Sequence, residues 1–124
     1  MYTVLRFEHP GLPLAGIAEI GRQINGIIEG LFDGVDKVEN RFSCSISSNG
    51  DPDAHVHEIV AKLTRLHPLL SQLAPKKWEF EIDVALEGES ERAYDTFSFP
   101  ADFLGVLASV KCRLTITQYN SDRV

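Results

Sequence analysis

Apolar and polar side chains alternate along several stretches of this chain, the pattern typical of strands with one buried face. The clearest alternation is in residues 77–87, KWEFEIDVALE. Its apolar positions are Trp78, Phe80, Ile82, Val84 and Leu86, and acidic residues fill most of the positions between them. Residues 2–8, 38–47 and 111–119 are also predicted to be strands, although Asn40 interrupts the alternation of the second.

Two longer stretches have apolar residues at helical spacing. In residues 12–32 the apolar stripe consists of Ile17, Ile20, Ile24, Ile27, Ile28 and Leu31. Residues 51–70 begin with Asp51, a suitable N-cap, followed by Pro52 at the first helical position. The apolar stripe of this second stretch is Val56, Ile59, Val60, Leu63, Leu66 and Leu70. A third, shorter helix is expected to begin at Pro100 and to carry Phe103, Leu104 and Leu107.

Glycine and proline residues affect the expected stability and the expected ends of these helices. The first stretch contains Gly16, Gly21, Gly26 and Gly30. Each glycine costs ~1 kcal/mol relative to alanine inside a helix, so we expect close packing to require some of them. Asp33 and Gly34 should stop the first helix, and Pro68 should bend or end the second.

The order of elements defines the expected fold. Residues 94–99 are predicted to form a strand that pairs with 77–87 as a hairpin, which gives the order β-α-β-α-β-β-α-β. Because the clearest strands have only one apolar face, helices should cover one side of a mixed sheet and leave the other in water. We therefore expect an α+β fold, a two-layer sandwich formed by a single domain over residues 1–124, with residues 119–124 as a loose tail.

Charge and composition exclude several classes of function. The formal net charge of −6 disfavours nucleic-acid binding and favours a basic partner. No stretch approaches the ~18 apolar residues that a membrane span requires, and the start MYTVLRFEHP does not resemble a secretory signal. We therefore expect no membrane partner and a cytoplasmic location. The two cysteines, Cys44 and Cys112, are too few and too far apart for a disulfide framework or a zinc knuckle.

The most conspicuous candidate for chemistry is residues 51–70, which contain His55, His57 and His67. Two residues two positions apart on a helix diverge by about 160°, so His55 and His57 cannot bind one metal together. Metal-capable pairs remain, Asp53 with His57 and His55 with Glu58, but each supplies only two ligands. We therefore expect no metal, an exposed His57, a helical Glu58–Lys62 ion pair, and a hydrogen-bonded His67.

Nucleophilic catalysis has little support in the sequence. Cys44 and Cys112 occupy inward strand positions, where a thiol acts as a small apolar side chain and its pKa rises. Phosphate-loop, dinucleotide-binding and nucleophile-elbow motifs are absent from the sequence. We therefore predict no catalytic residues, no cofactor and no enzyme activity. A dispersed enzyme site, for example His9, His55 and Asp95, stays open as an alternative.

The outward face of the predicted sheet is the remaining candidate site. Glu79, Glu81, Asp83 and Glu87 follow one strand, and Glu89 and Glu91 extend the acidic row into the next turn. Arg41 lies on another strand with small serines. Cross-strand salt bridges would satisfy part of this pattern. Alternatively, the acidic row steers a basic protein partner, in which case all seven residues belong to a partner-binding surface.

Size, acidity, one layer of helices and the lack of a catalytic set resemble the small bacterial immunity proteins that neutralise polymorphic or contact-dependent toxins. The segments WEFEIDVAL and FSFPADFLGVLASVKCRLTITQY also resemble the C-terminal part of an uncharacterised bacterial single-domain family. The first resemblance implies a non-enzymatic inhibitor, a monomer or weak dimer, whose acidic surface covers the basic site of a nuclease-like toxin. The alternative is a small-molecule or regulatory module with a cleft near Trp78, Tyr94 and His67.

Overall fold

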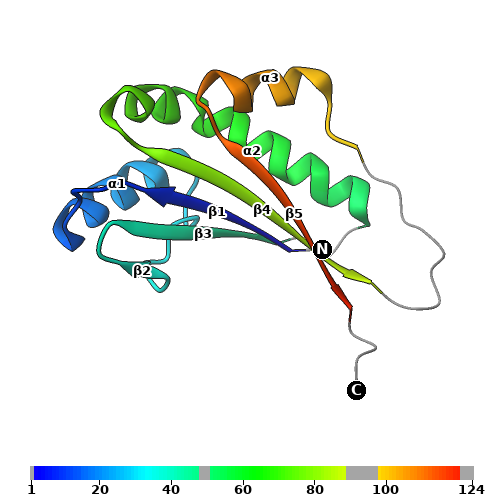
Figure 1. Cartoon of the computed structure of the whole chain (residues 1–124), viewed down its shortest axis with the longest axis horizontal. Helices are drawn as coiled ribbons and strands as arrows, with labels where there is room; N and C mark the ends of the chain where they lie inside the picture. Colours follow the sequence, from blue (N-terminus) through cyan, green and yellow to red (C-terminus); the bar gives the residue numbers. More distant parts are fainter. Residues whose placement is uncertain (1, 48–50, 89–97, 121–124) are drawn as a thin grey trace.

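A computed structural model describes residues 2–47, 51–88 and 98–120 of the chain. The order of elements is β1 (Tyr2–Glu8), α1 (Leu14–Ile27), β2 (Lys37–Val38), β3 (Arg41–Ser47), α2 (Pro52–Leu73), a short 3₁₀ helix η1 (Ala74–Lys76), β4 (Glu79–Gly88), α3 (Ala101–Ser109) and β5 (Arg113–Asn120). The helices lie on one side of a mixed sheet (Figure 1). The predicted α+β fold with two layers is confirmed.

The first strand in sequence is central in the sheet. The strand order is β2-β3-β1-β4-β5, so β1 pairs with β3 on one side and with β4 on the other, both antiparallel. The strands β4 and β5 are parallel. The crossover between them includes α3, as a parallel connection requires. Residues distant in sequence therefore become neighbours across β1.

The core lies between the helices and one face of the sheet. Alternate strand residues are buried there, including Leu5, Phe42 and Ile82, each no more than 2% exposed. Aromatic rings fill one end of this core: Phe7 stacks on Phe42 at 4.6 Å between ring centroids, and Trp78 meets both edge-on. Because consecutive strand residues point to opposite faces, this register places the polar side chains of the same strands together on the uncovered face.

Several boundaries differ from the sequence prediction, among them that of β5, which begins at Arg113 and includes the first two residues of the predicted loose tail. The predicted strand 38–47 is divided into β2 and β3, because Asn40 has a left-handed backbone with φ of 76°. The first helix ends at Ile27 rather than near residue 32, and the left-handed Gly30 follows it. Within the predicted strand 94–99, Ser98 and Phe99 form no strand, and residues 94–97 lie outside the described part of the chain.

The second helix begins as predicted but ends later. Asp51 caps it, since its Oδ1 accepts a hydrogen bond from the Ala54 amide at 2.9 Å. The helix continues through Pro68 to Leu73, and Pro68 therefore does not terminate it. A proline interrupts the helical hydrogen-bond series without ending the helix where packing compensates. Leu66, Leu69 and Leu70 around this proline are all buried in the core.

Candidate functional site on the open face of the sheet

The side of the sheet opposite the helices is called the open face below. Its rows follow from the strand register, in which Arg6 of β1 lies between Ser43 of β3 and Glu81 of β4. The next strand outward places Arg113 opposite Glu81. Basic and acidic side chains thus alternate across the three strands β1, β4 and β5. This row crosses the acidic strand predicted from the sequence nearly at right angles.

Two carboxylates of β4 are held in a network, the carboxylate network, that spans β1, β4 and β5. Arg6 Nη1 donates to Glu81 Oε1 at 2.7 Å and to Asp83 Oδ2 at 3.0 Å. The second oxygens accept from hydroxyls, Glu81 Oε2 from Thr115 at 2.8 Å and Asp83 Oδ1 from Thr117 at 3.0 Å. Arg113 adds a longer ion pair to Glu81 at 3.7 Å. Each carboxylate oxygen therefore has a fixed partner.

The carboxylate network also stabilises the charged form of its arginine. The hydrogen bond to Asp83 is the main cause that raises the pKa of Arg6 above its ordinary value, and Glu81 raises it further while partial burial opposes both. The side chains of Glu81 and Asp83 are only 23% and 18% exposed, whereas that of Arg6 is 45% exposed. The result is a rigid charged surface rather than a row of free acids.

The other predicted partner-binding residues are distributed more widely. Glu79 is exposed on the open face, and Arg41 is exposed on β3. These two residues flank Glu8, which pairs with Arg41 on one side and with Glu79 on the other. Glu87 lies in β4, but its side chain is outside the described part of the structure, as are Glu89 and Glu91 altogether.

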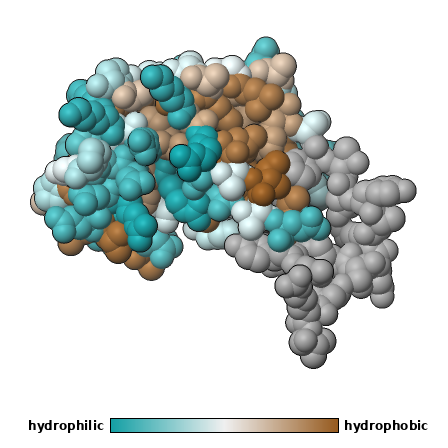
Figure 2. Space-filling view, viewed as in Figure 1, coloured by the Kyte–Doolittle hydropathy of each residue, from teal (hydrophilic) through white to brown (hydrophobic). Residues whose placement is uncertain are grey.

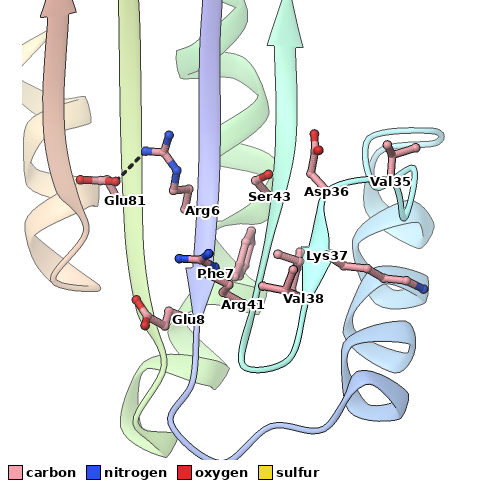
Figure 3. Close-up of a pocket in the computed structure, with 11 residues that line it drawn as sticks. Arg6, Phe7, Glu8, Val35, Asp36, Lys37, Val38, Arg41, Ser43 and Glu81 are labelled. Carbon is pink, nitrogen blue, oxygen red and sulfur yellow. Dashed lines mark hydrogen bonds and ion pairs between the residues drawn. The ribbon is translucent and has the colours of Figure 1, made fainter.

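A groove of about 540 Å³ borders the carboxylate network. Arg6, Arg41 and Glu81 line its sheet side, and the segment around β2 contributes Val35 and Val38 (Figure 3). The two valines are 76% and 50% exposed. The groove therefore combines apolar contact area with charged groups in defined positions, the composition of many binding surfaces.

The histidines of α2 have separate roles. His57 is exposed, as predicted. His67 is within hydrogen-bond distance of two serine hydroxyls, those of Ser109 at 2.9 Å and Ser71 at 3.3 Å, as expected for a hydrogen-bonded residue. His55 is fully buried, and its Nε2 lies 2.7 Å from Oγ1 of the equally buried Thr3. Burial of His55 could have been inferred from its position four residues before Ile59 in the apolar stripe.

The alternative sites proposed from the sequence are not assembled in the described residues. His9 lies just beyond the end of β1 and His55 contacts Thr3 near its start, so six residue steps along the strand, roughly 20 Å, separate them. Asp95 and Tyr94 lie outside the described part of the chain. Trp78 contacts His9 and the aromatic core, while His67 contacts α3, so these two side chains do not share a cleft.

One cysteine lies in the core, and the other packs against it. Cys44 is 1% exposed, and Cys112 is partly buried against the core. Burial raises the pKa of both thiols to about 12, with a smaller contribution from nearby carboxylates. A thiol with so high a pKa is a poor nucleophile at neutral pH. Within the described residues, no three histidine, cysteine or acidic side chains converge as metal ligands.

Part of the surface, over α3 and the edge strand β5, is apolar. Figure 2 shows apolar surface gathered over α3 and β5, whereas the part around α1 and β2 is mostly hydrophilic. The exposed apolar side chains there include Leu104 and Ile116, 44% and 51% exposed. None of the described helices has the length and apolar character needed to cross a membrane.

Comparison with known families, proteins and structures finds no match to this chain. No family model matches the chain. No curated protein and no solved structure matches it either. Functional inference therefore depends on the geometry of the open face.

Proposed function

We propose that this protein is a non-enzymatic inhibitor that binds a protein toxin on the open face of its sheet, the role of a bacterial immunity protein. The carboxylate network is the observation that carries the proposal. Glu81 and Asp83 are held by Arg6, Thr115 and Thr117 before any partner arrives. Binding then orders few side chains, which lowers the entropic cost of association.

The net charge of −6 supports a basic partner, such as a nuclease-like toxin. Charge of this sign accelerates encounter with a basic protein and repels nucleic acid, which is the property an inhibitor of a nuclease needs. Such a toxin acts inside the cell, so the inhibitor would act in the cytoplasm, as a monomer or weak dimer. The groove beside Val35 and Val38 would supply apolar contact next to the charged groups.

The first experiment is to purify the product of a toxin-like reading frame adjacent to the gene and to measure its binding by calorimetry. We expect a dissociation constant in the nanomolar range, roughly −12 kcal/mol, which weakens as salt is added. Co-expression should also protect cells from the toxin. No binding to the product of any neighbouring reading frame would overturn the proposal.

Charge substitutions test whether the toxin binds the open face. Glu79→Lys should weaken binding of the toxin and leave the fold intact, because this side chain is exposed and lies outside the carboxylate network. Glu19→Lys is the matched control, since Glu19 is exposed on α1, away from the open face. Equal effects of the two substitutions would show that only the net charge matters. Binding unaffected by Glu79→Lys and by Arg6→Gln would place the toxin on another surface.

A further inference from the structure

A second hollow, of about 570 Å³, lies at one end of the open face, and it is called the basic hollow below. Its basic side chains are Lys77, just before β4, Lys111, between α3 and β5, and Arg113, the first residue of β5. Trp78 and Pro10 contribute apolar surface. This volume is in the range of small-molecule sites.

The backbone at both lysines is unusual. Lys77 has φ of 69° and Lys111 has φ of 55°, both in the left-handed region. Each residue closes a helix, Lys77 after η1 and Lys111 after α3, at the position where glycine is most common because it has no Cβ to strain. Non-glycine residues held in such conformations by the surrounding structure are found more often at functional sites.

The charges of the basic hollow are incompletely paired. In the part of the chain that the structure describes, neither lysine makes an ion pair, and Arg113 makes only the 3.7 Å contact with Glu81. A positive charge near a helix C-terminus is favourable in itself. That effect explains each lysine separately, but it does not explain why both line the same hollow with an arginine.

Two carboxylates complete the lining. Glu8 and Glu79 lie directly opposite each other on neighbouring strands, an arrangement that repulsion makes unfavourable by itself. With three basic and two acidic side chains, the lining carries a net charge of +1. It therefore suits a ligand that combines an anionic group with hydroxyl groups.

We propose that the basic hollow binds the phosphate group of a small phosphorylated molecule. Lys77, Lys111 and Arg113 contact the phosphate oxygens, for which lysine acts as a point charge and arginine as a planar donor. Glu8 and Glu79 accept hydrogen bonds from hydroxyl groups elsewhere on the ligand. This site goes beyond toxin binding and does not depend on it.

The direct test titrates the protein with ribose 5-phosphate, inorganic phosphate and ribose. Calorimetry measures the affinity, and the fluorescence of Trp78, the single tryptophan of the chain, reports occupancy of the hollow. We expect ribose 5-phosphate to bind more tightly than ribose by tenfold or more. Equal affinities for ribose 5-phosphate and inorganic phosphate would identify the free anion as the ligand of the same site. The proposal would be overturned if calorimetry detected no binding of ribose 5-phosphate or inorganic phosphate at concentrations up to about 10 mM.

Glycine substitutions at the two lysines test phosphate binding while preserving the fold. Lys77→Gly and Lys111→Gly each remove a charge and also relieve the left-handed backbone, so each should weaken phosphate binding about tenfold while thermal stability changes little. Asn40→Gly is the control for the backbone, because Asn40 is also left-handed, with φ of 76°, and does not line the hollow. Lys37→Ala is the control for charge, since Lys37 lines the separate groove. Unchanged phosphate affinity in the double variant of Lys77 and Lys111 would contradict the proposed site.

Discussion

Thr3 and His55 form a buried polar contact between the central strand and the second helix, with Oγ1 of Thr3 2.7 Å from Nε2 of His55. Both residues are 0% exposed. A titratable side chain in this position links the stability of the fold to pH, because a buried imidazole resists protonation.

Stability is expected to fall in mild acid. Burial lowers the pKa of His55 below its ordinary value of 6.5, with a smaller effect of the N-terminal amine. The unfolded chain binds the proton at the ordinary pKa and the folded chain only at lower pH, so stability is complete above about pH 6.5 and decreases below it. Urea unfolding followed between about pH 5 and pH 8 measures this decrease.

Variants of two histidines test whether His55 causes this dependence of stability on pH. His55→Gln should reduce the loss of stability between neutral and mildly acidic pH, although it lowers stability at every pH. His57→Gln is the matched control, because His57 is exposed on the same helix. An identical pH dependence in the His55 variant and the unaltered protein would show that other groups cause it.

Arg6 and Asp83 should stabilise each other measurably. A double-mutant cycle with Arg6→Gln and Asp83→Asn is expected to give a coupling free energy of about 0.5–1 kcal/mol, the upper part of the range for partly exposed pairs. Urea unfolding of the four proteins measures it, and added salt should reduce it. The exposed Arg22–Glu19 pair on α1 is the comparison, and its coupling should be smaller. A coupling of zero for Arg6 and Asp83 would mean that this ion pair does not stabilise the folded protein.

Two glycines of α1 should respond oppositely to alanine. A Cβ at Gly21 would lie 2.1 Å from the ring of Phe32, and this ring packs against Phe42 while Asn25 binds the Phe32 amide and carbonyl at 2.8 Å each. Gly21→Ala should therefore destabilise the protein by about 1–3 kcal/mol. Gly26 has no neighbour within 4 Å of such a Cβ, so Gly26→Ala should stabilise it by up to about 1 kcal/mol. Thermal unfolding of both variants checks the packing of this helix against the segment that follows it.

Both thiols should be protected in the folded protein. A pKa of about 12 leaves Cys44 and Cys112 almost fully protonated at pH 8. A thiol-specific disulfide reagent should label them slowly in buffer and rapidly in denaturant. Cys44→Ala and Cys112→Ala variants then show which thiol any native labelling modifies. Rapid labelling of Cys44 in the folded protein would contradict its placement in the core.

Local sequence patterns predicted most elements, because alternation and helical spacing depend on neighbouring residues. Trp78 to Leu86 alternate as predicted, and Asp51 caps its helix. The division between β2 and β3 was not predicted, although Asn40 already interrupted the alternation there. Asparagine tolerates the left-handed conformation better than most residues, so this interruption was the available signal.

The carboxylate network could not be predicted, because it depends on strand order. Arg6 and Glu81 are 75 residues apart in sequence, and no local pattern indicates that β1 inserts between β3 and β4. For the same reason the acidic row of β4 appeared unpaired in the sequence. Only its neighbours across the sheet show that Glu81 and Asp83 are already engaged.

The central position of β1 also constrains the order of folding. Its pairing with β3 can form early in synthesis, but its pairing with β4 must close a loop that contains both long helices. Such non-local closure has an entropic cost that slows folding relative to helical proteins of the same size. A nascent chain that ends after α2 would leave one edge of β1 open, with its amides and carbonyls available to other chains. β1 therefore gains its second neighbour only after most of the protein has been synthesised.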